Sequence, residues 1–124
     1  KLTFAEYQDS DGAFDDGNDK FTVPTGKGGR YFITAGGTFY SNSSNRVTDA
    51  VIYIYKNGSQ VNEAYQPLGS QYSANPGANA VSSSISAILN LSADDYIEVY
   101  GVVTTNSGAV SFGASNFSGF RLGD

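Results

Sequence analysis

Acidic side chains are the residues of this chain best suited to chemistry, and one group of them lies near the start. It holds five aspartates within eleven positions: Asp9, Asp11, Asp15, Asp16 and Asp19. Calcium prefers several oxygen ligands around a flexible loop, so this group makes a calcium site possible. Its spacing does not fit an EF-hand loop and no glutamate closes it. We therefore expect a solvated acidic loop and no metal.

A second acidic group consists of Asp94, Asp95 and Glu98. Two carboxylates placed across a sugar bond could hydrolyse it. Adjacent aspartates are more typical of a turn, where Asp hydrogen-bonds its own backbone, and Glu98 falls on the outer face of a predicted strand. The chain also lacks Cys and His, which removes thiol nucleophiles, thiolate metal sites and the usual general base. We expect a protein that is not an enzyme and needs no cofactor.

The length and net charge of the chain limit the number of domains and the kinds of partner that we expect. A chain of 124 residues predicts one domain, spanning 1–124. The net charge of -5 disfavours nucleic acid, which requires a basic surface to displace counterions. No apolar run approaches the length of about 18 residues that a bilayer requires, so we expect no membrane insertion.

Short stretches of alternating apolar and polar residues, separated by Gly, Asn and Pro, predict an all-β protein. Their regular spacing favours a two-sheet antiparallel β-sandwich. Asn57-Gly58 predicts a tight hairpin, since both residues tolerate positive φ. In Val81–Leu91 the inward residues should be Ile85, Ala87, Leu89 and Leu91. The expected strands are Leu2–Tyr7, Phe21–Val23, Arg30–Tyr40, Ala50–Lys56, Ser59–Tyr65, Val81–Leu91, Tyr96–Val103, Ala109–Phe112 and Phe117–Leu122, and the expected loops are Asp9–Lys20, Ser41–Thr48 and Gln66–Asn79.

Several of these strands are apolar on both faces, which is more than one sandwich with a solvated outer face requires. An additional apolar face with small residues between the large ones is typical of a subunit interface. We expect this interface to include Phe32 and Thr34 in one strand and Ile88 in another.

Two predicted loops mix tyrosine with Ser, Asn and Gly, a composition that favours binding. The rings offer apolar area at low entropic cost, and the small polar residues supply hydrogen bonds. The alternative, that the loops are only soluble connections, stays open. The candidate ligand-binding residues are Asn42, Ser43, Asn45, Arg46, Tyr65, Gln66, Gln71 and Tyr72.

Five segments between Asp16 and Phe120, taken in order, resemble the C1q domain, and the resemblance covers nearly the whole chain. Gly29-Arg30-Tyr31-Phe32-Ile33 is similar to the family's Gly-x-Tyr-x-Phe signature, with Ile33 in place of the second aromatic residue. Asp16 to Pro24 resembles the family's approach to its central strand, and Val51 to Gly58 resembles its hairpin entry. Leu91 to Val99 resembles its turn between two major strands, and Phe117-Ser118-Gly119-Phe120 resembles its last strand.

This resemblance implies a C1q/TNF-like jelly roll that assembles as a homotrimer. Family members that bind calcium carry acidic residues in the loop matching Gln66–Asn79, which here contains none. The Ser-, Asn-, Gly- and Tyr-rich surface is similar to C1q-like modules of bacteriophage structural proteins. The implied role is a trimeric head on a virion surface, which binds a host-surface glycan or protein or decorates the capsid. Two alternatives are an extracellular, secreted C1q-like lectin or pattern-recognition domain, and a purely structural trimerisation cap or cement protein.

Overall fold

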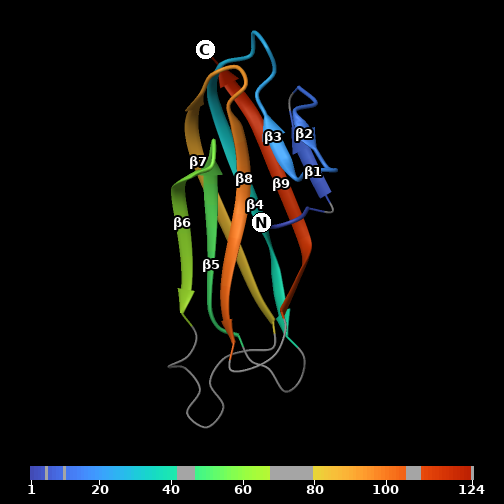
Figure 1. Cartoon of the computed structure of the whole chain (residues 1–124), viewed down its shortest axis with the longest axis vertical. Coiled ribbons are helices and arrows are strands. Elements are labelled where there is room, and N and C mark those ends of the chain that lie inside the picture. Colours follow the sequence, from blue (N-terminus) through green and yellow to red (C-terminus); the bar gives the residue numbers. More distant parts are fainter. Residues whose placement is uncertain (5, 10, 42–46, 68–79, 106–109, 124) are drawn as a thin grey trace.

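The computed structural model of this chain is a sandwich of two β-sheets (Figure 1). It describes residues 1–4, 6–9, 11–41, 47–67, 80–105 and 110–123, and within these ranges it contains nine strands and no helix. The strands are β1 (Glu6–Asp9), β2 (Phe14–Asp15), β3 (Lys20–Thr22), β4 (Gly29–Ser41), β5 (Val47–Lys56), β6 (Ser59–Pro67), β7 (Ala80–Leu91), β8 (Tyr96–Thr105) and β9 (Val110–Gly123).

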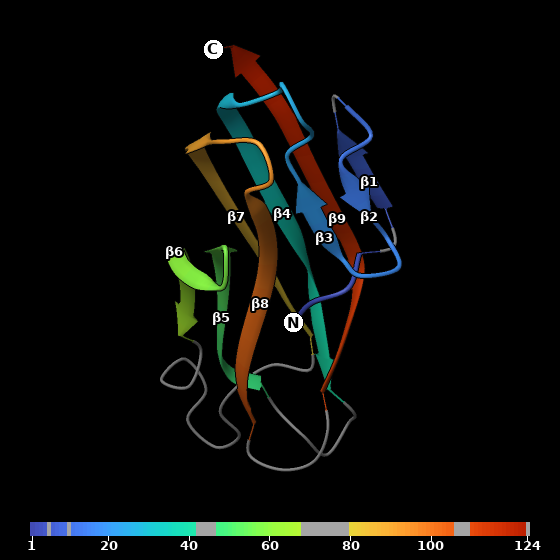
Figure 2. The same cartoon turned by 45° about the horizontal axis from the view of Figure 1, so that its top comes forward.

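The order of the strands identifies the fold. Sheet A has the order β1-β9-β4-β7 and sheet B has the order β2-β3-β8-β5-β6, and Figures 1 and 2 show these two layers. The pairs nest: β5 pairs with β6, β4 with β7, β3 with β8, and β1 with β9. This nesting is that of a long antiparallel ribbon rolled into a sandwich, which is a jelly-roll topology. The predicted all-β jelly-roll sandwich is confirmed, although β1 runs parallel to β9.

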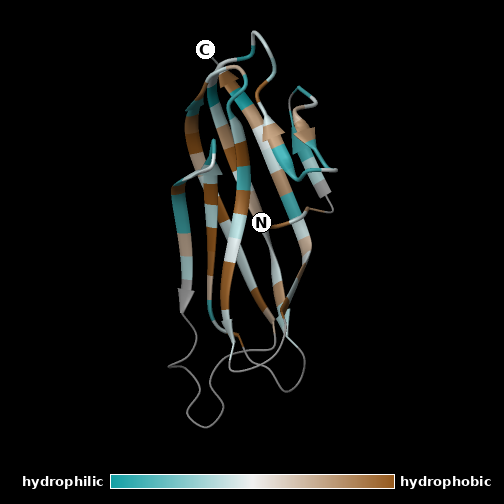
Figure 3. Cartoon of the chain, viewed as in Figure 1, coloured by the Kyte–Doolittle hydropathy of each residue, from teal (hydrophilic) through white to brown (hydrophobic). Residues whose placement is uncertain are grey.

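Alternation along the strands builds the core between the sheets. Figure 3 shows apolar and polar bands following one another along the strands, as the two-residue period of a strand requires. In β7, Ile85 and Leu91 are buried, and Ala87 and Leu89 pack against the core. The four inward residues predicted for this strand are therefore confirmed.

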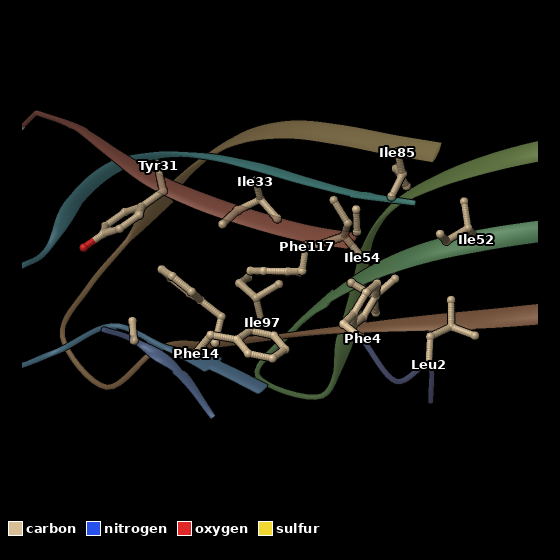
Figure 4. Close-up of a cluster of buried hydrophobic side chains, with 14 of the residues drawn as sticks. Leu2, Phe4, Phe14, Tyr31, Ile33, Ile52, Ile54, Ile85, Ile97 and Phe117 are labelled. Carbon is tan, nitrogen blue, oxygen red and sulfur yellow. The ribbon is translucent and has the colours of Figure 1, made fainter. Parts of the chain in front are cut away.

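An aromatic cluster centred on Phe117 of β9 joins the N-terminal segments to the sandwich (Figure 4). The ring of Phe117 lies 5.7 Å from that of Phe4, 4.9 Å from that of Phe14 and 5.8 Å from that of Phe21, measured between centroids. Each such pair contributes about 0.5–1.5 kcal/mol beyond the burial of its area. Gly119 makes room for this packing, because a Cβ there would stand 2.7 Å from the Phe21 ring.

Two turns at one end of the sandwich are bonded to each other. Asn57 and Gly58 have φ of 52° and 83°, which confirms the predicted hairpin between β5 and β6. The Asn57 side chain donates to Asp95 Oδ1 at 2.7 Å and accepts from the Tyr96 amide at 2.8 Å. Asp95 also accepts from the Ser92 amide at 2.8 Å and lies 3.1 Å from Lys56 Nζ. These bonds, above all that from Ser92, lower the pKa of Asp95 to about 2.

The N-terminal predictions need correction. The strand expected at Leu2–Tyr7 lies later, at Glu6–Asp9. Leu2 and Phe4 instead bury their side chains, and the Leu2 amide donates to the Val99 carbonyl at 2.8 Å. The expected loop Asp9–Lys20 contains the short strand β2, because Phe14 is buried and pairs with Phe21.

The end of the chain also differs from expectation. Two strands were predicted at Ala109–Phe112 and Phe117–Leu122, but one strand runs from Val110 to Gly123. Ala114 is an additional residue in this strand, with φ of 47°, and the register against β4 shifts there. This β-bulge lets the strand bend without ending.

We expect Asp95→Asn to lower the free energy of unfolding at pH 7 by about 1–2 kcal/mol, less than the full pKa difference implies because the carboxylate is partly solvated. The folded-state pKa of Asp95 lies below its ordinary value of 3.8. Its contribution is therefore complete above about pH 4 and is lost as pH falls towards 2. Urea unfolding of the variant and the wild type across this range measures the difference.

Asp94→Asn is the matched control, because Asp94 is exposed in the same turn at φ 70°, which Asn tolerates. A loss of stability in both variants, or a loss from Asp95→Asn that does not shrink at low pH, would contradict this role of the Asp95 carboxylate.

Candidate functional site

The described strand ends that flank the predicted binding loops lie at one end of the sandwich. The end of β4, the start of β5, the start of β7, the end of β8 and the start of β9 meet there, opposite the Asn57-Gly58 hairpin (Figure 1). Gln66 lies in β6, where it pairs with Ala50. Six other candidates lie outside the described residues: Asn42, Ser43, Asn45, Arg46, Gln71 and Tyr72.

Tyr65 is the predicted binding residue whose surroundings the structure describes. It lies in β6, not in a loop, and its side chain is 59% exposed. Its hydroxyl donates to Asp49 Oδ1 at 2.7 Å, and this hydrogen bond raises the pKa of the Tyr65 phenol. The bond holds an exposed ring in one orientation over sheet B.

Tyr65 borders a larger group of rings on the outer face of sheet B, which we call the tyrosine patch: Tyr53, Tyr55, Tyr65 and Tyr100. The rings of Tyr55 and Tyr100 lie 4.5 Å apart between centroids, tilted by 40°. The rings of Tyr53 and Tyr55 lie 6.3 Å apart and nearly perpendicular, at 89°. Sequence reasoning found that Ala50–Lys56 is apolar on both faces but did not identify this patch, because it depends on β8 lying beside β5.

The three predicted interface residues lie together on the outer face of sheet A. Phe32 of β4 pairs with Ile88 of β7 on one side and with Phe120 of β9 on the other. The three side chains form one row across the sheet, and Ile88 is 62% exposed. Thr34, two residues further along β4, lies 3.1 Å from the Ser86 hydroxyl between their oxygen atoms. Phe120 was not among the residues predicted for this face.

Beside this apolar row the outer face of sheet A is polar and slightly hollow. A shallow depression of about 300 Å³ lies above Gly36. Thr34, Thr38, Ser82 and Asn116 are among the residues that line it. Glycine is favoured at position 36, because a Cβ there would stand 3.0 Å from the Ser83 carbonyl oxygen.

The aspartates near the N-terminus bond to the protein itself. Asp9 accepts from the Phe14 amide at 3.0 Å, and Asp19 accepts from the Phe4 amide at 3.0 Å. Asp15 accepts from the Asn18 side chain at 2.6 Å, and this bond lowers the pKa of Asp15. Within the described part of the chain, no three acidic side chains come together as a metal site would require.

The other acidic group is also engaged in structural contacts. Asp95 holds the turn described above, and Glu98 lies 3.0 Å from Lys1 Nζ. Neither carboxylate faces a second one across a described cavity. In the part of the chain that the structure covers, no helix is long and apolar enough to cross a membrane.

Comparison with known proteins adds no family to this fold. No protein-family model matches the chain, and no curated protein matches it significantly. The structure itself therefore defines the class, a jelly-roll-like β-sandwich. The resemblance to the C1q domain rests on the five sequence segments alone.

Calcium should not change the stability of the protein, because Asp9, Asp15 and Asp19 already accept hydrogen bonds from the chain. Melting curves in millimolar calcium and in excess chelator should coincide. A ligand at a hundredfold excess over its Kd would add about 2.7 kcal/mol. A fall of that size in chelator would contradict the expectation, and loss of the response in Asp16→Asn would locate the site in the acidic loop.

Proposed function

We propose that this chain is a non-enzymatic head domain that works as a homotrimer, with the outer face of sheet A as its subunit interface. The observation that carries the proposal is the apolar row Ile88-Phe32-Phe120. Ile88 is 62% exposed and Phe120 38% exposed in the single chain. Leu122, on the same side of β9, is 55% exposed. A contiguous group of large apolar side chains on a sheet face favours contact with another protein surface.

The polar part of the same face supports the proposal. Along β4, the outward positions from Phe32 to Tyr40 carry no charged residue, and neither do the neighbouring outward positions described in β7 and β9. Depletion of charge is typical of the centre of an interface. Thr38 and Ser82 bond to each other at 2.9 Å, so these hydroxyls need few bonds from water. A second copy could therefore cover them at small cost.

The resemblance to the C1q domain supplies the number of subunits and the setting. We propose a trimeric C1q-like head on the surface of a bacteriophage virion, which binds a host-surface glycan or protein or decorates the capsid. Three identical heads would bind a surface with high avidity even where each site is weak. A secreted C1q-like lectin and a structural trimerisation cap or cement protein remain the competing proposals.

The non-enzymatic role is supported by how the acidic side chains are used. Asp9, Asp15, Asp19 and Asp95 accept hydrogen bonds within turns or from neighbouring segments, and Glu98 pairs with Lys1. Glu63 differs from these residues, because the contact described for its carboxylate, with the Gln60 side-chain amide, is long at 3.4 Å. Glu63 pairs with Tyr53 across the strands and does not lie beside a second acid.

Ile88→Asp should convert the trimer to folded monomer. The side chain is exposed in the single chain, so the fold should survive. In the trimer the new carboxylate would be buried without a partner in every copy, at a cost of several kcal/mol each. We expect the dissociation constant of the trimer to rise by at least about a thousandfold. Sedimentation velocity at micromolar concentration measures the species present.

Val61→Asp is the matched control, because Val61 is also an exposed apolar residue in a strand, 44% exposed, but lies in sheet B. It should remain trimeric. A wild-type protein that sediments as a folded monomer at micromolar concentration would reject the proposal, as would equal dissociation of both variants.

Tyr72→Ala should weaken attachment to the target surface by about 1–2 kcal/mol per site, if the loops bind as their composition indicates. Trimer sedimentation and the melting temperature should not change. Attachment is measured on intact host cells and on isolated capsids. If a full set of substitutions between residues 42 and 46 and at 71 and 72 leaves attachment unchanged, the cement role is favoured over recognition.

A further inference from the structure

The tyrosine patch lies on the side of the sandwich opposite to the proposed subunit interface. Its residues come from the adjacent strands β8, β5 and β6 of sheet B (Figure 2). Because Ile52 and Ile54 of β5 point into the core, the alternate residues Tyr53 and Tyr55 point outward. The patch therefore stays accessible whether or not sheet A is covered, and what it binds does not depend on the trimer.

The rings of the patch form two walls at nearly a right angle. Tyr55 and Tyr53 supply the perpendicular pair, at 89°, and Tyr100 packs against Tyr55 at 4.5 Å. Neighbours hold these three rings, all of them only part-exposed. Because they are held, they would lose little further freedom when a ligand binds. The negative face of an aromatic ring attracts a cation.

The three strands that form the patch carry outward charge of one sign. The outward positions of β5, β6 and β8 carry three carboxylates, Asp49, Glu63 and Glu98, and no lysine or arginine. Asp49 is bonded to Tyr65 and Glu98 to Lys1. Glu63 pairs with Tyr53 across the strands, and the one polar contact described for its carboxylate is the Gln60 amide at 3.4 Å. Glu63 is therefore an acceptor available beside the rings.

The same face already holds two ammonium groups of the chain itself. Lys20 Nζ lies 4.8 Å from the centroid of the Tyr96 ring. Lys1 Nζ lies 3.0 Å from Glu98, the outward residue between Tyr96 and Tyr100 along β8. At one end of β8, a ring thus contacts one lysine and a neighbouring carboxylate pairs with another. Both kinds of group lie side by side at Tyr100, Tyr53 and Glu63, where the described residues supply no cation.

We propose that the tyrosine patch binds lysine side chains of a basic segment of another protein. The ammonium group lies over the rings of Tyr53 and Tyr55 and donates to Glu63. The aliphatic stem of the lysine lies along Val51 and Val102, which pair with each other just beyond Tyr53 and Tyr100. Val102 is 55% exposed, so its surface is open to such a contact.

The test is a titration of the full chain with a capped oligolysine peptide, measured by calorimetry and by the tyrosine ring resonances in NMR spectra. We expect binding that weakens as salt is added, with shifts at Tyr53, Tyr55 and Tyr100. Glu63→Gln should weaken binding about three- to fivefold, as loss of an exposed charge pair does. Tyr100→Leu, which keeps apolar area but removes a ring, should weaken it by a similar factor.

Asp16→Asn is the matched control, because it removes the same charge from an exposed turn distant in the sheet from the patch. Equal weakening by Asp16→Asn and Glu63→Gln would mean attraction by net charge alone and would overturn the proposal. Ring shifts caused by a neutral oligosaccharide but not by the peptide would assign the patch to a glycan and also overturn it. Ring shifts that follow protein concentration without peptide would assign it to a second copy, with the same consequence.

Sedimentation of the same variants separates this result from the proposed trimer. Glu63→Gln and Tyr100→Leu should sediment as the wild type does. Loss of peptide binding in Tyr100→Leu supports the proposal only if this variant keeps the melting temperature of the wild type. Glu63→Gln is an independent test, because Glu63 is exposed and the change is nearly isosteric.

Discussion

The burial of Phe117 is the constraint on which the rest of the structure depends. Its ring is the common surface for Phe4, Phe14 and Phe21, which come from three separate N-terminal segments. Phe4 lies outside the strands, and β2 and β3 have two and three residues, so packing on Phe117 adds to the few strand pairings that hold these segments in place. Because Phe117 points inward, the two-residue period of β9 sends Phe120 outward, next to Phe32. The exposed apolar row of sheet A thus follows from the same choice of register that fills the core.

Alternation of apolar residues was enough to predict the long strands and their inward faces. It succeeded for Val81–Leu91 because the two faces of that strand differ in composition, with mostly serine on the outward side and mostly apolar residues on the inward side. It failed where a local rule was broken. Ala114 adopts a positive φ that its sequence does not signal, and the run from Gly113 to Asn116 therefore looked like the end of a strand. Leu2 and Phe4 read as strand residues, yet they contribute to the core without strand pairing.

The sequence predicted the candidate surface residues within a single strand, but not which residues of different strands lie side by side. Phe32 and Ile88 could each be identified as a large apolar residue on the outward face of its strand. That they share a row with Phe120 required the order of the strands, which depends on contacts more than 80 residues apart in the chain. The tyrosine patch was missed for the same reason, since Tyr53 and Tyr100 become neighbours only when β8 pairs with β5. Residue types show which side chains could bind, and topology shows which of them meet.

The position of β9 has a consequence for synthesis of the protein. This strand is the last described along the chain, yet it lies inside sheet A, between β1 and β4. While a ribosome makes the chain, sheet A lacks an inner strand until β9 has emerged, and Phe4 has no Phe117 ring to pack on. Pairing over such distances is also slow, on the order of milliseconds to seconds for all-β domains. A nascent chain therefore exposes the apolar residues that pack on β9 until β9 has left the ribosome, the interval in which chaperone binding would protect it most.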